Sequence, residues 1–183
     1  MRTVLAGLLL AMVFVAGADS AGTRVLRSGH AERSVAALPA PMTLAGVGGV
    51  APGMTVAEVQ RAWGVPVVPE GSGPCRMARI AVGRVRGYAL FQEGRLGAVF
   101  FTAGIRSDRG IGVGSTRAAI SHAYGTSLIW WPDPNSPGYH VYTRPRYLGD
   151  KRAIRFDINP GKSGLVSQIG LGGPALSFSS GRC

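Results

Sequence analysis

Apolar residues at helical spacing predict a short helix in the first half of the chain. Val56, Val59 and Trp63 fall on one face of a helix. Thr55 and Glu58 have the spacing of a capping box, in which the side chain of each residue accepts a hydrogen bond from the backbone N–H of the other. The residue after Trp63 is a glycine, which can end a helix in the left-handed conformation. The pattern therefore predicts a helix that starts after Thr55 and stops at Trp63.

The same pattern returns later in the chain at a constant offset. The stretch Gly49–Gly64 matches Gly110–Gly125 in its glycines, its capping threonine and its alanines, with apolar residues of similar size between them. In the second copy Ala119 stands where the capping box requires an acid, so we expect the N-terminus of that helix to be less stable. Internal repetition of this kind indicates two copies of one structural unit.

Strand-like segments bounded by turn residues follow each predicted helix. In the first half they are 79–83, 87–92 and 96–102, with a tight turn at Glu93-Gly94. In the second half they are 126–131, 139–143, 153–158 and 165–171, with a longer hairpin at Asn159-Pro160-Gly161. The sequence predicts an α+β fold of two tandem repeats, 46–104 and 105–183, each a short helix packed on an antiparallel β-meander.

The helix-entry motif resembles that of two known families. Its residues are Pro52-Gly53-Met54-Thr55, then Val59, then Gly64-Val65-Pro66. This pattern is similar to the tandem-repeat fold of the beta-lactamase inhibitor protein family, and to the single-unit domain of the small lipoproteins of the outer-membrane assembly machinery. The resemblance implies the fold and an inhibitor-like binding role. The sequence departs from both families, because each predicted repeat holds a single cysteine, at quite different positions, and no cysteine closely follows the predicted signal peptide.

The start of the chain has the pattern of a secretory signal. Arg2 precedes an apolar run from Val4 to Ala18 that ends in a small-x-small cleavage site. We expect a signal peptide at 1–18 and a flexible basic leader at 19–45, so that the protein is secreted. An uncleaved membrane anchor is the alternative, although the run is shorter than the roughly 20 residues that a span requires.

The chain is strongly basic, with a formal net charge of +11. Arginine supplies nearly all of this charge, and the arginines are spread along the chain. Such a surface favours an anionic partner, which in an exported protein would be an acidic protein face or a cell-envelope component rather than nucleic acid. Biased codon composition is the alternative explanation.

Two cysteines in an exported chain predict one disulfide, between Cys75 and Cys183. It would close a loop of more than 100 residues, worth about 4–5 kcal/mol in the chain-entropy model. Cys75 is expected in a Gly/Pro-rich turn. Free thiols or an intermolecular link remain the alternatives.

Residues for catalysis or metal binding do not gather in the sequence. His30, His122 and His140 show no spacing typical of zinc ligands, and the few carboxylates form no convincing acid–base pair. The glycines at 110–114 lack the lysine of a phosphate-binding loop. We therefore expect no enzyme activity, no cofactor and no metal, although a hydrolase with a divergent site stays open.

The best binding candidate is a proline-rich loop with aromatic flanks, from Trp130 to Tyr142. Rigid aromatic residues near arginine are typical of protein-binding hot spots. One of the two tryptophans should face inward, because side chains alternate along a strand. The candidate residues are Trp130, Trp131, Tyr139, His140, Tyr142, Arg144 and Arg146.

The sequence thus predicts a secreted, non-enzymatic binding protein that recognises a protein or cell-envelope partner, and the resemblance implies an inhibitor-like action. The alternative is a structural or stress protein held at the envelope by charge, without a discrete protein partner. Salt separates these two hypotheses, since binding by exposed charges decays with ionic strength.

Overall fold

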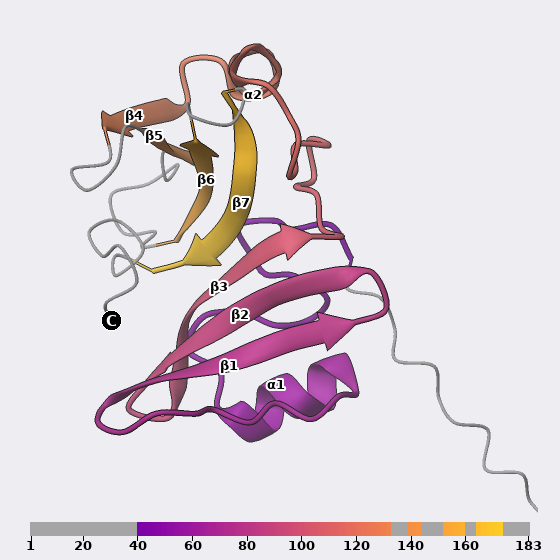
Figure 1. Cartoon of the computed structure of the whole chain (residues 1–183), viewed down its shortest axis with the longest axis vertical. Helices are drawn as coiled ribbons and strands as arrows, with labels where there is room; N and C mark the ends of the chain where they lie inside the picture. The colour runs from indigo at the N-terminus through magenta and orange to yellow at the C-terminus, as the bar shows by residue number, and fades with distance from the viewer. Residues whose placement is uncertain (1–39, 133–138, 144–151, 160–163, 174–183) are drawn as a thin grey trace, which may run out of the picture. The chain divides into compact units, whose positions relative to one another are not determined.

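The computed structural model describes residues 40–132, 139–143, 152–159 and 164–173 (Figure 1). Within this part the chain has two helices and seven strands. The predicted α+β class with antiparallel strands is confirmed. The elements are α1 (Val56–Trp63), β1 (Cys75–Val82), β2 (Val85–Gln92), β3 (Arg95–Ala103), α2 (Arg117–Tyr124), β4 (Leu128–Pro132), β5 (Tyr139–Thr143), β6 (Ala153–Asn159) and β7 (Leu165–Gly172).

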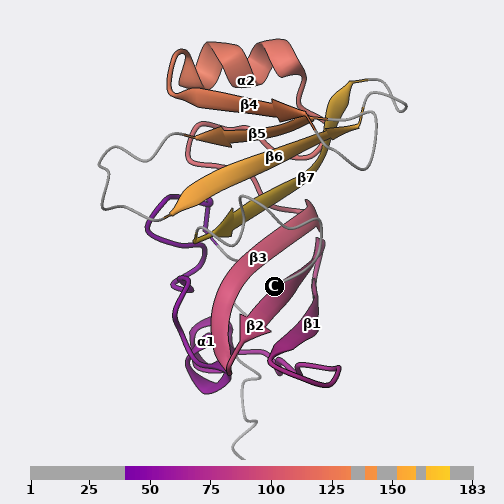
Figure 2. The ribbon, with the colours of Figure 1, turned by 90° about the vertical axis from the view of Figure 1, so that its left-hand side faces the viewer.

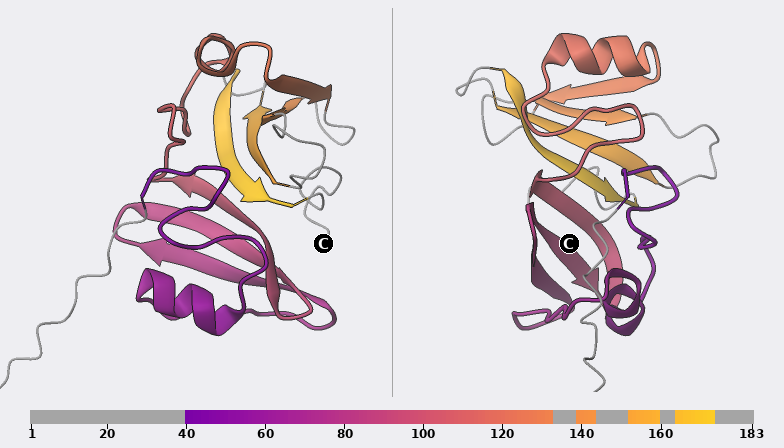
Figure 3. Two further views of the ribbon diagram at one scale, coloured as in Figure 1. Left: turned by 180° about the vertical axis from the view of Figure 1, so that it is seen from behind. Right: turned by 90° about the vertical axis from the view of Figure 1, so that its right-hand side faces the viewer.

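The strands form one antiparallel sheet in the order β1-β2-β3-β7-β6-β5-β4. Trp63 of α1 packs edge to face on Phe101, with ring centroids 6.3 Å apart, and Tyr124 of α2 packs on Phe156, with centroids 5.5 Å apart. Phe101 and Phe156 both pair with Ile169 in neighbouring strands, so they lie on one face of the sheet. Both helices therefore cover the same face, where the main hydrophobic core lies (Figures 2 and 3).

The start and end of α1 follow the predicted signals. The Thr55 side chain accepts a hydrogen bond from the Glu58 backbone N–H, and the Glu58 carboxylate accepts one from the Thr55 backbone N–H at 2.7 Å. This second bond is the main cause of the lowered pKa of Glu58. Gly64 ends the helix with φ of 66°, in the left-handed region. The capping box and the glycine stop are confirmed.

The second helix keeps only part of this arrangement. The Thr116 side chain accepts a hydrogen bond from the Ala119 backbone N–H at 3.1 Å, and no acidic side chain stands in the first turn. Gly125 follows the helix with φ of 54° and ψ of −130°, which is outside the left-handed helical region. The helix is thus capped at its start by one side-chain bond instead of two.

Each helix entry is bound to the start of a later strand by the same pair of backbone bonds. Gly53 donates to the Leu96 carbonyl at 2.7 Å, and Leu96 donates to the Met54 carbonyl at 2.7 Å. In the second half, Gly114 donates to the Val166 carbonyl at 2.8 Å and Val166 donates back to the Ser115 carbonyl at 2.9 Å. The residues just before α1 and α2 are thereby fixed to β3 and β7.

The two halves of the sheet meet where β3 pairs with β7. Phe100 lies opposite Gly170, at the middle of four paired positions that run from Ala98 to Phe101 on β3. A Cβ atom on Gly170 would lie 2.5 Å from the Phe100 ring. The ring occupies the space that a side chain at position 170 would need, so glycine is required there for close packing.

Some boundaries differ from the sequence predictions. β1 starts at Cys75, earlier than predicted, because residues 75–78 pair with β2 up to Gln92. The placement of Cys75 in a turn was therefore wrong. The packed part also begins before the predicted end of the leader at residue 45, because Met42 is fully buried and donates a backbone hydrogen bond to the Arg106 carbonyl. Residues 1–18 lie outside the described part, and no helix within that part is long and apolar enough to span a membrane.

Candidate functional site

The predicted proline-rich loop joins β4 and β5, which pair as a hairpin. Pro132 lies opposite Tyr139, Trp131 opposite His140, and Trp130 opposite Val141. These pairings set both flanks of the loop in one ladder, whereas residues 133–138 at its tip lie outside the described part. The sequence was therefore right about the two strands that hold the loop.

Trp130 is a packing residue more than an exposed anchor. It is half-buried against the core, and the Arg117 guanidinium lies over its ring at 4.4 Å from the centroid. A cation held at this distance from an aromatic face stabilises the contact. Trp130 thereby ties α2 to the edge strand β4, and its inward position agrees with the alternation expected for the tryptophan pair.

The other predicted binding residues are placed only in part. Trp131, Tyr139, His140 and Tyr142 have defined positions in β4 and β5, but their side chains lie outside the described part. Arg144 and Arg146 lie wholly outside it. Cys75 is not a free thiol, while Cys183 lies outside the described residues, so their pairing stays a prediction.

The face of the sheet opposite the helices carries a network that the sequence analysis missed. We call it the helix-free face and define it by residues whose strand register places them there. Phe100 pairs with Tyr88 on one side and Gly170 on the other, and Gly170 pairs with Arg155. The same face includes Met77, Leu90, Ala98, Ile129, Asp157 and Gln168.

Phe100 lies at the centre of this network. Its ring stacks on Tyr88 with centroids 5.0 Å apart, and the Arg155 guanidinium lies 5.6 Å from its centroid. Phe100 is only 4% exposed and Arg155 only 5%. Stacked aromatic rings beside a guanidinium gain both dispersion and cation–π energy, so the three side chains form a fixed unit.

Polar contacts extend the network from β6 to β7 and back to β2. Arg155 donates through Nε to the Asp157 carboxylate at 2.5 Å. Gln168 donates through Nε2 to the other Asp157 oxygen at 3.0 Å, and its own carbonyl accepts from the Tyr88 hydroxyl at 3.3 Å. Burial raises the pKa of Tyr88, so the phenol stays neutral and able to donate.

Exposed apolar residues lie at the two ends of the same face. Met77 on β1 is 42% exposed and Ile129 on β4 is 39% exposed. Met77 pairs with Leu90 on β2. Ile129 pairs with Tyr142 on β5, which in turn pairs with Arg155 on β6. A packed, buried centre thus lies between two exposed apolar side chains on a face that no described helix covers.

The candidate site has no feature of a metal centre among the described residues, where no three metal-ligating side chains gather. Comparison of the chain with models of protein families, with curated proteins and with solved structures finds no match. The consecutive residues Phe100 and Phe101 gave the only sequence signal for the helix-free face. Side chains alternate along a strand, so two adjacent phenylalanines must cover both faces.

Proposed function

We propose that the protein is an exported binding protein that recognises an acidic protein partner through the helix-free face. The observation that carries this proposal is the pair of exposed apolar side chains, Met77 and Ile129, at the ends of a face whose centre is the packed network of Tyr88, Phe100 and Arg155. A one-sided antiparallel sheet normally turns polar side chains to water. Here the side opposite the described helices holds a packed aromatic and guanidinium centre with exposed apolar side chains at its two ends, and such residue types are enriched in interface hot spots.

The charge of the chain supports an acidic partner. Its formal net charge is +11, and on the helix-free face of β1 the exposed Arg79 pairs in register with Tyr88. Positive charge at the rim of an interface steers an acidic protein toward it and raises the association rate. The apolar side chains of Met77 and Ile129 would then supply contacts that persist in salt.

We also propose that the fold is a tandem repeat, as the resemblance to the beta-lactamase inhibitor family implies. The paired bonds of Gly53 and Leu96, matched by those of Gly114 and Val166, support this interpretation. The antiparallel pairing of β3 with β7 supports it too, because Phe100 and Gly170 take equivalent places in the two halves. A binding role without catalytic turnover fits this resemblance.

A second candidate function is a charge-held structural protein of the cell envelope. Exposed arginines such as Arg61, Arg84 and Arg109 favour it. Binding by such charges does not require Met77 or Ile129, and it weakens steeply as ionic strength rises. The two proposals therefore differ in what salt and surface variants do.

The test is retention of a purified partner or envelope fraction at low and high salt. Met77→Ser/Ile129→Ser removes the exposed apolar groups of the helix-free face, and Val68→Ser is the matched control, because Val68 is 65% exposed but follows α1. We expect one identified protein to stay bound to the wild type and to Val68→Ser at high salt, and to be lost from the double variant. Retention only at low salt by all three would support the envelope alternative and contradict recognition by this face.

A further inference from the structure

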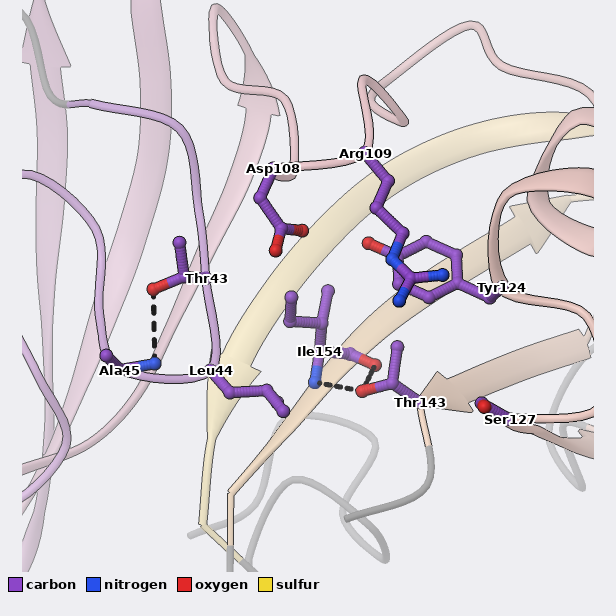
Figure 4. A pocket seen from close by; sticks show the side chains of 9 residues that line it. All are labelled: Thr43, Leu44, Ala45, Asp108, Arg109, Tyr124, Ser127, Thr143 and Ile154. Carbon is purple, nitrogen blue, oxygen red and sulfur yellow. Dashed lines mark hydrogen bonds between the residues drawn. The ribbon is translucent and has the colours of Figure 1, made fainter. Parts of the chain in front are cut away.

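A cavity of about 370 Å³ lies between the chain segment before α1, the connection after β3 and the second half of the sheet (Figure 4). It is separate from the helix-free face. Its wall combines apolar groups with hydroxyl and charged groups, and its size is within the range of small-ligand sites. The lining residues that matter here are Leu44, Asp108, Arg109, Tyr124 and Ile154.

The Tyr124 hydroxyl at this cavity has no hydrogen-bond partner among the described residues. Tyr124 is only 8% exposed, and Figure 4 shows its hydroxyl directed toward the space beside Asp108 and Arg109. Ser107 and Asp108 are near enough to influence its pKa, yet neither makes a hydrogen bond of acceptable geometry with it. A buried hydroxyl without a partner costs free energy, so a ligand group that accepts a hydrogen bond from it would be bound favourably here.

The matching position in the first half is already satisfied. Trp63 stands at the same place in α1 as Tyr124 in α2, and its indole Nε1 donates to the Val47 carbonyl at 3.1 Å. That carbonyl belongs to the loop before α1. The corresponding loop before α2 leaves Tyr124 facing the cavity, so the acceptor that the first half supplies from its own backbone is missing in the second.

Two opposite charges stand at the mouth of the cavity. The Arg109 guanidinium lies over the Tyr124 ring at 4.8 Å from the centroid, and its Nη1 donates to the Ala123 carbonyl at 2.5 Å. These contacts fix the guanidinium while leaving other N–H donors free for a ligand. The Asp108 carboxylate accepts no hydrogen bond from another described residue.

We propose that this cavity binds a small α-amino acid in its zwitterionic form. The ligand carboxylate accepts hydrogen bonds from the Tyr124 hydroxyl and the Arg109 guanidinium, and the ligand ammonium faces Asp108. A short apolar side chain fits against Leu44 and Ile154, which line the same cavity. The carboxylate thus takes the place that the Val47 carbonyl has beside Trp63.

The test is titration of the purified protein with L-valine, followed by two-dimensional amide NMR. Isovalerate keeps the carboxylate without the ammonium, and isobutylamine keeps the ammonium without the carboxylate. We expect L-valine to shift the amide signals of Ser107, Ser127 and Thr143, with isovalerate and isobutylamine each at least about tenfold weaker, because each loses one charge-assisted contact.

Variants locate the binding and separate it from changes in folding. Tyr124→Phe removes only the hydroxyl and should weaken L-valine binding about tenfold, while Arg109→Ala should weaken it further. Ser121→Ala removes an exposed hydroxyl from the same helix and should leave binding unchanged. Equal binding by isovalerate and L-valine would overturn the zwitterion. No shift with any of the three probes, or binding that Tyr124→Phe leaves intact, would overturn the site.

Discussion

The two helices end in aromatic residues at matching positions, yet the polar atoms of these residues have different partners. Trp63 in the first half donates to the Val47 carbonyl at 3.1 Å, whereas Tyr124 in the second half makes no hydrogen bond within the described residues. A similar contrast occurs where the halves meet, since Phe100 on β3 faces Gly170 on β7. At this position the first half supplies an acceptor from its own backbone, whereas the Tyr124 hydroxyl of the second half lies at a cavity without one.

Substitution of Phe100, which faces Gly170 where the two halves meet, should have the largest effect on stability. Phe100→Ala removes a ring that packs between Tyr88 and Arg155 and leaves a cavity at the junction of β3 with β7. We expect the free energy of unfolding to fall by about 3–5 kcal/mol, measured by urea denaturation. Phe100→Leu, which keeps much of the volume, should cost less. A loss below about 1 kcal/mol for Phe100→Ala would contradict a packed centre on the helix-free face.

Trp63→Phe tests whether the first half depends on its internal hydrogen bond. The substitution removes the indole donor to the Val47 carbonyl, which keeps the Val50 backbone N–H as a donor at 3.0 Å, and it removes part of a ring that contacts Phe101. The free energy of unfolding should fall by about 1–3 kcal/mol, from the lost hydrogen bond and the lost packing together. Urea denaturation of this variant beside Tyr124→Phe gives the direct comparison. Equal effects of the two substitutions would remove the distinction between the halves.

The helix starts give a smaller contrast. Thr55→Ala breaks a capping box, while Thr116→Ala breaks a single cap, so we expect losses of about 1 kcal/mol and about half of that. The measurement is thermal unfolding followed by circular dichroism.

The pH dependence of the same variants sharpens this test. Hydrogen bonds from Thr55 lower the pKa of Glu58 in the folded state, so the stability that Glu58 adds is present above its unfolded value and is lost as pH falls through the folded value. Thr55→Ala keeps the backbone N–H that lowers this pKa most and removes the hydroxyl that also donates to the Glu58 carboxylate at 2.9 Å, so only the part of its cost that depends on this second bond should disappear in acid. The effect of Thr116→Ala should not change, and a parallel decline of both would contradict the asymmetry of the caps.

Local features of the fold were predictable from the sequence, whereas pairings between distant segments were not. Thr55, Glu58 and Gly64 act on neighbours within one helix, and their spacing is enough to predict where α1 begins and ends. The turn at Glu93-Gly94 is local in the same way, with both residues at positive φ. These signals need no knowledge of the rest of the chain.

The pairing of β3 with β7 depends on residues about seventy positions apart and has no local signal. It decides that Phe100 faces Gly170 and that Arg155 reaches the same ring, so the helix-free face could not be inferred from either segment alone. The Trp130 loop was an obvious candidate because its aromatic residues are adjacent in sequence. Tyr124 lies in the segment predicted as the second helix, but the missing partner of its hydroxyl could not be predicted, because it depends on the loop around Asp108.

Tyr124→Phe should have the smallest effect on folding, and that makes it informative. The hydroxyl is buried without a partner, so its removal should change the free energy of unfolding by no more than about 0.5 kcal/mol at neutral pH, or raise it. Burial raises the pKa of the Tyr124 phenol, so the stability from its neutral form is complete below the unfolded value near 10 and is lost as pH rises through the folded value. Phenylalanine at position 124 should therefore lessen the alkaline loss, as urea denaturation between pH 9 and about 11 would show. A clear destabilisation at neutral pH would mean that the hydroxyl has a partner in solution, and the second half would then be as closed as the first.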